Sequence, residues 1–214
     1  MTDRLVLALD TATVVNVGLA RGSQVLAVAT VTDRMAHAEQ LMPLVADTLA
    51  RGGVRVADLD QIVVGLGPGP FTGLRVGVVT AQILATVTGV PLHGVCSLDA
   101  LAVEYAATDP AGKFVVATDA RRREVYWASY AADGRRQHGP TVERPDAVPQ
   151  LPTIGPAGDL YPDQLRVVPG PRRLDPGVMA VRAPDLPDAG REPLYLRRPD
   201  ASEPSRPKSV LHGR

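Results

Sequence analysis

The sequence is poor in the residues that build cross-links and metal clusters. Cys96 is the single cysteine among 214 residues, so neither an internal disulfide framework nor a zinc site made of several thiolates is available. The four histidines show no metal-ligand spacing; they are His37, His93, His138 and His212. We therefore expect Cys96 to be a small buried hydrophobic residue, and we expect no metal centre.

An excess of charge and a long hydrophobic run are also lacking. Basic and acidic residues number 23 each, so no global field draws the whole surface toward nucleic acid or a membrane. The apolar run before Asp10 is too short for a signal peptide, and longer apolar stretches are interrupted by Arg75, Gln82 or threonines. We expect a cytoplasmic protein without a membrane anchor, and 45% apolar residues suffice for a core.

Hydrophobic patterns in the first half of the chain predict mixed α/β structure. Three β-rich runs, at 4–10, 15–21 and 24–32, are separated by short polar turns and predict an antiparallel meander. The elements expected next are a helix at 37–51, a strand at 61–66, a helix at about 71–88, a strand at 92–95 and a helix from Ser97.

The second half begins as a weak repeat of the first. "FVVATDARRREVYWASY", residues 114–130, again gives a strand, an aspartate at its end and a second strand. Beyond Gly139 the helical periodicity almost disappears, because 15 of the 20 prolines lie in 140–207, and we expect short strands in long connections there. The domains expected are an N-terminal lobe at 1–109, a smaller lobe at 110–198 and a mobile tail at 199–214.

The stretch "GLGPGPFTGLRVGVV", residues 65–79, is a glycine-rich turn that opens into a helix. A phosphate-binding loop points several backbone N–H groups at the anion, but Pro68 and Pro70 remove two of these donors. No Gly-Lys-Ser/Thr follows, and the glycine spacing matches neither the P-loop nor the dinucleotide motif. The pattern therefore favours a structural turn that aims the helix over a direct phosphate site.

The helix after this turn carries a ridge of small residues. Gly73, Gly77, Ala81 and Ala85 recur every four residues, while large apolar side chains cover most other directions. A second helix could approach such a ridge closely, by ridge-in-groove packing. Two interpretations are equally compatible with the pattern: the helix at 37–51 fills the groove within the chain, or both helices together present a partner-binding face.

Other stretches offer candidate ligands for phosphate. Asp10, Thr11 and Thr13 lie at the end of the first strand, where a carboxylate can hold hydrated magnesium, and Asp119 lies in the equivalent place of the second half. A strand-end aspartate more commonly bonds the amides of its own turn. Arg121, Arg122 and Arg123 suit phosphate, although an arginine turn is more often solvated. No Gly-x-Ser-x-Gly nucleophile motif is present in the sequence.

Together these stretches resemble the bacterial TsaB (also called YeaZ) family, the accessory paralogue of the TsaD subunit that makes threonylcarbamoyladenosine beside the tRNA anticodon. The matching segments are "LALDTAT" at 7–13, "HAEQLMPLV" at 37–45, "GLGPGPFTGLRVGV" at 65–78, "GVPLHGVCSLDAL" at 89–101, "TDARRREVYWASY" at 118–130 and "PLYLRRPD" at 193–200. They cover both halves in order.

The resemblance implies a two-lobed actin-like, sugar-kinase-like ATPase fold with ribonuclease H-like lobes, the second reduced. It also implies that the chain is not the transferase. In the catalytic paralogue two histidines in H-x-x-x-H spacing bind the metal, and Ser97 and Leu101 stand at the matching positions. "DTAT" replaces the Asp-x-Gly-Thr of active ATPases, and Ala12 hinders close approach to a phosphate. The segment "RRLDPGVMAVRA", 172–183, is a poor match for the helix usual before "YLR".

The resemblance further implies partners. The two N-terminal-lobe helices are expected to pair with their counterparts in a TsaD-type subunit, a TsaE-type ATPase is expected to join, and tRNA is expected to bind through the complex. The expected interface residues are His37, Leu41, Leu44, Val45, Phe71, Gly73, Leu74, Gly77, Val78, Ala81 and Ala85. Arg121–Arg123 are a candidate tRNA contact, and a lone chain is expected to cover its apolar helices as a homodimer.

No catalytic residue and no resident cofactor are expected, and ATP with Mg is expected only weakly or at interfaces of the complex. The alternative is a stand-alone small-molecule kinase or ATPase of the same fold, with Asp10 and Asp119 around magnesium and Thr11 and Thr13 at the phosphates. A glycoprotease ranks last, because the sequence offers neither a metal-binding histidine pair nor a nucleophile motif.

Overall fold

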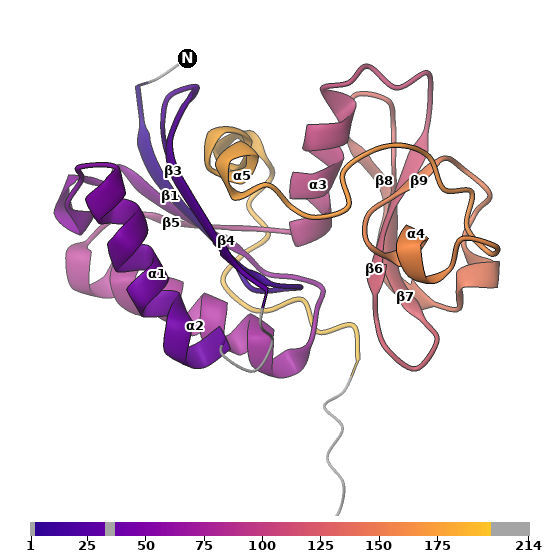
Figure 1. Ribbon diagram of the computed structural model, residues 1–214, viewed down its shortest axis with the longest axis horizontal. Helices are drawn as coiled ribbons and strands as arrows, with labels where there is room; N and C mark the ends of the chain where they lie inside the picture. The colour runs from indigo at the N-terminus through magenta and orange to yellow at the C-terminus, as the bar shows by residue number, and fades with distance from the viewer. Residues whose placement is uncertain (1–2, 33–36, 198–214) are drawn as a thin grey trace, which may run out of the picture.

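The computed structural model describes residues 3–32 and 37–197, without the side chains of residues 37–39 and 185. It contains two sheets, each at the centre of a lobe, and the lobes lie side by side (Figure 1). The strands of the first lobe are β1 (Leu5–Asp10), β2 (Val15–Arg21), β3 (Gln24–Val31), β4 (Gln61–Gly65) and β5 (Leu92–Val95). Its helices are α1 (His37–Arg51), α2 (Phe71–Thr88) and α3 (Ser97–Ala106).

The first sheet has the strand order β3-β2-β1-β4-β5. β1 and β3 pair antiparallel with β2, as the predicted meander requires, whereas β4 and β5 join in parallel after helical crossovers. The strands and helices predicted for residues 4–106 are confirmed. Wherever the sequence predicted the first or last residue of an element, the structure agrees within one residue.

Alternation along β1 divides the core of this lobe into two layers. Leu5, Leu7 and Leu9 point toward α1 and α2, while Val6 and Ala8 point to the opposite face. The second layer does not end at the lobe boundary, because its cluster continues through α3 into Phe114 and Tyr130 of the second sheet. The two lobes therefore share a hydrophobic core.

The second lobe repeats the plan of the first with fewer helices. Its elements are β6 (Phe114–Asp119), β7 (Val125–Tyr130), β8 (Arg136–Glu143), β9 (Thr153–Ile154) and α4 (Ala157–Leu160). The order β8-β7-β6-β9 again has three antiparallel strands followed by a parallel one. This confirms the repeat seen in the sequence and the short strands predicted beyond Gly139.

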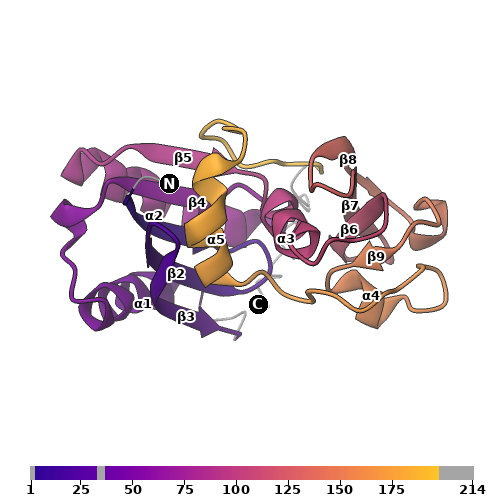
Figure 2. The same cartoon turned by 90° about the horizontal axis from the view of Figure 1, so that it is seen from above.

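The segment 172–183, which matches the helix of the family poorly in sequence, nevertheless contains a helix in the structure. α5 (Pro176–Arg182) begins after Asp175, whose side chain accepts hydrogen bonds from the backbone N–H groups of Gly177 and Val178 at 2.7 and 3.1 Å. It crosses the first sheet and packs on β1, β2 and β3 (Figure 2). The chain thus returns to the first lobe, and a division at residue 109 misses this return.

The last described segment, residues 188–197, is here called the strap because it runs from the first lobe to the second. The backbone N–H of Ala189 donates to Gly94 O at 2.7 Å and that of Leu194 to Leu66 O at 2.8 Å. Arg197 then donates through Nη1 to Ala120 O at 2.8 Å in the second lobe and forms an ion pair with Glu124. The predicted tail, 199–214, lies outside the described residues.

Candidate functional site

Asp10, the strand-end carboxylate, is buried and fully engaged within the chain. Its Oδ2 accepts a 2.5 Å hydrogen bond from Ser97 Oγ, and its Oδ1 accepts one from the backbone N–H of Ala12 at 3.1 Å. Burial raises the pKa of Asp10 from 3.8 to about 6, against the opposing effect of these two hydrogen bonds. With 1% of its surface exposed, the carboxylate points into the molecule rather than toward a ligand.

Ser97 and Leu101, aligned above with metal-binding histidines, have other roles in the structure. Besides donating to Asp10, Ser97 Oγ accepts a hydrogen bond from the backbone N–H of Gly67 at 3.1 Å, which ties the Gly/Pro turn to α3. Leu101 packs in the core shared by the lobes. Within residues 3–32 and 37–197 no group of three His, Cys, Asp or Glu is placed to hold a metal ion.

Cys96 is buried as predicted, between β5 and α3. Burial, and next the negative charge of Asp99, raise the pKa of its thiol to about 12. The thiol is therefore protonated at neutral pH, a state in which it is a poor nucleophile.

The small-residue ridge of α2 faces the chain's own β1–β2 turn, so the interpretation that it receives a foreign helix is wrong. Gly73, Gly77 and Ala81 are buried, and a Cβ at Gly77 would overlap Oγ1 of Thr11. That hydroxyl donates to Gly73 O at 2.8 Å. The ridge lacks side chains because the helix lies directly on the turn after β1. The other interpretation, that α1 fills the groove, is also incomplete, since this turn occupies part of it.

This packing decides where the predicted interface residues lie. Seven are buried within the chain and would not reach a partner without opening the lobe: Leu41, Val45, Gly73, Leu74, Gly77, Val78 and Ala81. Leu44, Phe71 and Ala85 are partly buried, and the side chain of His37 is outside the described residues. The interface prediction is therefore corrected at those seven positions.

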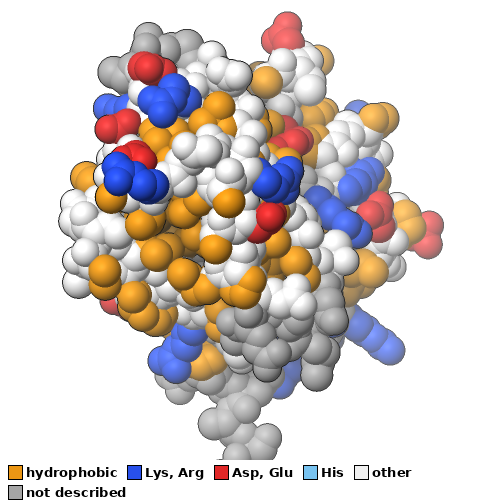
Figure 3. All heavy atoms as spheres, turned by 60° about the vertical axis from the view of Figure 1, so that its left-hand side comes forward, with side chains coloured by type: hydrophobic (Ala, Val, Ile, Leu, Met, Phe, Trp, Pro, Cys, Tyr) orange, Lys and Arg blue, Asp and Glu red, His pale blue; other side chains and the backbone are white. Residues whose placement is uncertain are grey.

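An exposed apolar face lies on the opposite side of the same helices. Val79, Ile83 and Val87, four residues apart on α2, are 48%, 57% and 79% exposed, and Met42 of α1 is 46% exposed. Figure 3 shows hydrophobic side chains gathered on this side of the molecule. We call these four residues the α1/α2 face. Sequence reasoning missed them because it assigned the binding surface to the ridge rather than to the large side chains opposite.

α2 is also apolar and long enough to cross a membrane, by length and composition alone. In the structure it lies against its own sheet, through five buried residues that include Leu74 and Val78. The C-terminal end of the helix is closed by Gly89, whose left-handed conformation, with φ 73°, lets its N–H bond Ala85 O at 2.9 Å.

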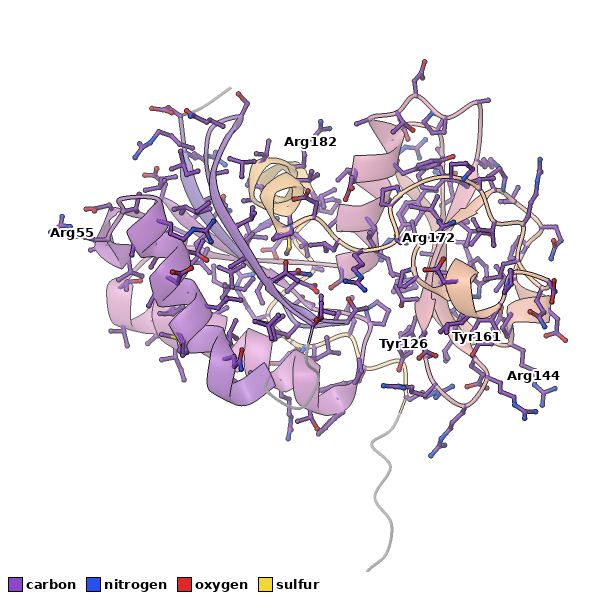
Figure 4. The ribbon with its side chains drawn as sticks, viewed as in Figure 1. Arg55, Tyr126, Arg144, Tyr161, Arg172 and Arg182 are labelled. Carbon is purple, nitrogen blue, oxygen red and sulfur yellow. The ribbon has the colours of Figure 1, made fainter. Side chains whose placement is uncertain are left out.

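A hollow of about 600 Å³ lies between the lobes and brings together part of the predicted nucleotide site. Thr13 lines it from the β1–β2 turn, and Asp119 and Arg121 line it from the β6–β7 turn. Asp10 and Thr11 are buried behind it and do not line it. Arg172 and Arg173, which the sequence reasoning did not single out, line the side that adjoins α4; Figure 4 labels Arg172 there.

The three arginines of the β6–β7 turn have an unusual backbone. Arg121, Arg122 and Arg123 have φ values of 63°, 56° and 60°, a left-handed region that non-glycine residues seldom occupy in succession. Asp119 accepts a hydrogen bond from the backbone N–H of Arg121 at 2.8 Å. All three side chains are exposed, and Arg121 and Arg122 also line a smaller hollow of about 200 Å³ beside the strap.

The paired sheets, the shared core and the inter-lobe hollow define a two-lobed α/β protein of the actin-like ATPase fold. Two solved structures from Pseudomonas aeruginosa have this arrangement. A protein described as similar to peptidase YEAZ aligns with TM-score 0.76 at 26% identity, covering 92% of this chain and all of its own. YeaZ aligns with TM-score 0.70 at 28% identity, covering 86% and 90%.

The chain belongs to the TsaB/YeaZ family. The family model of TsaD, tRNA N6-adenosine threonylcarbamoyltransferase, matches residues 28–165. The Mycobacterium tuberculosis protein Rv3421c is 46% identical over 203 residues, 92% of this chain and 93% of its own length. The Escherichia coli tRNA threonylcarbamoyladenosine biosynthesis protein TsaB is 38% identical over 97 residues, which are 45% of this chain and 42% of that protein.

Proposed function

We propose that this chain is the accessory, non-catalytic subunit of a tRNA threonylcarbamoyladenosine-forming complex and that it binds a TsaD-type transferase through the α1/α2 face. Membership of the TsaB/YeaZ family supports the pathway, since several relatives are named tRNA threonylcarbamoyladenosine biosynthesis protein TsaB. In this proposal a TsaE-type ATPase joins the pair, tRNA binds the assembled complex, and the complex works in the cytoplasm.

The observation that carries the proposed pairing is the stripe on α2. Val79, Ile83 and Val87 lie on one side of the helix with between 48% and 79% of their surface in water. Single exposed apolar residues are common, whereas three along one side of a helix, with a further exposed apolar residue, Met42, on α1, are typical of an interface. Two helices that present such a stripe form half of a helical bundle, which a matching pair from a partner completes. Without that partner, the same stripe would pair two copies of this chain.

Ser97 and Leu101 support an accessory role. A buried hydroxyl that is already bonded to Asp10 and an aliphatic side chain in the core do not offer the imidazole pair of the transferase. The stand-alone ATPase has less support, because Asp10, its magnesium ligand, is 1% exposed and its pKa is raised to about 6. Thr13 and Asp119 do line the inter-lobe hollow, so nucleotide hydrolysis by the isolated chain is worth measuring.

The pairing is tested by mixing this chain with its TsaD-type partner and measuring heterodimer formation by gel filtration. Ile83→Glu places a charge in the middle of the stripe and should weaken heterodimer formation at least tenfold, with little change in thermal stability because the side chain is 57% exposed. Leu160→Glu is the matched control, because Leu160 is 55% exposed in the second lobe. Equal affinity of the two variants would place the interface elsewhere.

The accessory role is tested separately, by reconstitution of tRNA modification from purified subunits. The complete mixture should form threonylcarbamoyladenosine, and omission of this chain should abolish product. Full activity from the partner subunits alone would refute the role, whatever the outcome of the pairing experiment.

A further inference from the structure

Two hollows between the lobes adjoin one another. The hollow of about 600 Å³ and the one of about 200 Å³ have Pro70, Asp119 and Arg121 in common. We call the residues that line either of them the inter-lobe trough. Its walls come from separate parts of the chain: the β1–β2 turn, Thr32 after β3, the start of α2, the β6–β7 turn, α4 with the segment that follows it, and the strap. The trough lies apart from the α1/α2 face, so a ligand there would not compete with the proposed protein partner.

The trough is basic although the chain as a whole is neutral. Five arginines line it against two aspartates, Asp119 and Asp159. The arginines are Arg121, Arg122, Arg172, Arg173 and Arg197. Arg172 is fixed by Asp159 at 3.1 Å and by Val168 O, also at 3.1 Å, whereas Arg173 is exposed. Arg121 lies 3.7 Å from Asp119, with 59% of its side chain exposed. A local surplus of guanidinium groups on a neutral protein favours an anionic ligand that extends along the trough.

Aromatic side chains lie among these arginines. Phe71, Tyr126 and Tyr195 line the smaller hollow, three of the eight aromatic residues in the whole sequence. Phe71 and Tyr195 stack with ring centroids 4.8 Å apart, and the guanidinium of Arg75 lies 4.4 Å from the Phe71 centroid. Tyr195 is 40% exposed, so part of this stacked pair is open to a further planar group. Figure 4 labels Tyr126 on the second-lobe side of this hollow.

From this combination we infer that the inter-lobe trough binds a single-stranded segment of RNA. Arginines along a groove hold successive phosphates, and an exposed aromatic ring accepts a base by stacking, without sequence readout. The recess of about 200 Å³ suits a single unpaired base rather than a duplex. This inference rests on the proposed function for its source of RNA, and it extends the candidate contact from the turn Arg121–Arg123 to both lobes and the strap.

A free nucleotide is the weaker occupant. The arginines are spread over both hollows and the strap rather than gathered at one phosphate chain. The turn at the start of α2 carries Pro68 and Pro70, which donate no N–H bonds, and its Gly69 approaches Ala12 so closely that a Cβ there would come within 2.6 Å of Ala12 O. It therefore packs against the β1–β2 turn and leaves little space for a phosphate between them.

The test is fluorescence anisotropy of the full chain with a labelled unstructured RNA 12-mer, across a range of salt concentrations. Arg121→Asn with Arg173→Gln should weaken binding at least tenfold and make the salt dependence shallower, by about 0.7 in the log–log slope for each phosphate that is no longer neutralised. Asparagine is chosen because it tolerates the left-handed backbone at 121. Tyr195→Leu should weaken binding about tenfold and leave the slope unchanged, because stacking releases no counterion.

Arg182→Gln with Arg55→Gln is the matched control, since both arginines are exposed and lie away from the trough (Figure 4). It removes the same charge and should bind RNA as the unchanged chain does. Equal weakening in control and test variants, tighter binding of the duplex form, or displacement of the RNA by equimolar ATP would overturn the inference. Absence of RNA binding with intact heterodimer formation would overturn it while leaving the proposed pairing in place.

Discussion

At the scale of single residues, Asp10 makes the stability of the fold depend on pH. Its pKa is about 6 in the folded chain and 3.8 as an ordinary aspartate, so the folded state holds its proton to higher pH than the unfolded state does. The free energy of unfolding should then fall by about 2 kcal/mol between pH 4 and pH 6, out of about 3 kcal/mol over the whole titration, since each unit of pKa difference is worth about 1.4 kcal/mol.

Asp10→Asn tests this dependence, because asparagine does not titrate. Thermal unfolding measured from pH 4 to pH 7 should show a flatter stability profile for the variant, with any constant loss from the altered Ser97 hydrogen bond independent of pH. Asp99 and Glu104 also have raised pKa values through burial, but they contribute equally to both proteins. Parallel profiles would mean that Asp10 titrates alike in the folded and unfolded chain.

Gly77 shows why the ridge of α2 carries no large side chains. A Cβ there would overlap the Thr11 hydroxyl, so Gly77→Ala should destabilise the fold by about 1–3 kcal/mol, offset in part by the roughly 1 kcal/mol that alanine adds to a helix. Urea unfolding measures the change. Gly112→Ala is the control, because no atom lies within 4 Å of its added Cβ, and it should stay within about 0.5 kcal/mol. Equal midpoints for the two variants would show that Thr11 moves aside without cost.

At the scale of elements, the sequence located most helices and strands but not the faces they use. The repeat of small residues on α2 identified a close approach correctly, yet a one-dimensional pattern does not say whether a helix or a turn makes that approach. Here Thr11, 62 residues from Gly73 in sequence, makes it. The exposed Val79, Ile83 and Val87 follow only once the opposite side of the helix is known to be buried.

α5 was missed for a different reason. Proline density beyond Gly139 argued against helices, but Asp175 followed by Pro176 is itself a start signal: an N-cap side chain and a first-turn residue with a suitable φ. Asp175→Ala removes both side-chain bonds to the first turn and should destabilise the chain by about 1 kcal/mol. Asp175→Asn should retain most of the stability in the same denaturation experiment. Equal destabilisation by alanine and asparagine would mean that the cap is not what supports α5.

At the scale of the whole molecule, the two-lobe plan could be predicted because the second half repeats the first, strand by strand around Asp10 and Asp119. The inter-lobe trough could not be predicted, since its residues come from distant parts of both halves of the chain and no local pattern joins them. The return of α5 to the first sheet, which the division at residue 109 misses, could not be predicted from the sequence either, because it depends on long-range contacts with β1, β2 and β3. Local chemistry specifies elements, while long-range packing decides which surfaces remain free.

The shared core predicts that the lobes unfold together. One hydrophobic cluster joins Val6 and Val63 of the first sheet to Phe114 and Tyr130 of the second, and the Tyr130 hydroxyl donates to Asp99 of α3 at 2.8 Å. Separating the lobes would expose this cluster and leave a buried carboxylate without that bond, so neither lobe should persist alone. A cooperative transition is therefore expected despite two sheets.

Trp127 allows this to be measured, because it is the only tryptophan and lies buried on the outer face of the second sheet. Its fluorescence reports the second lobe, whereas far-UV circular dichroism at 222 nm reports mainly α1, α2 and α3 of the first. The two signals should give coincident urea transitions. Phe114→Ala, which opens a cavity where the lobes meet, should shift both midpoints by the same amount, about 3–5 kcal/mol in stability. Separate transitions, or a shift of the fluorescence midpoint alone, would show that the lobes are independent units and that the strap and α3 are only linkers between them.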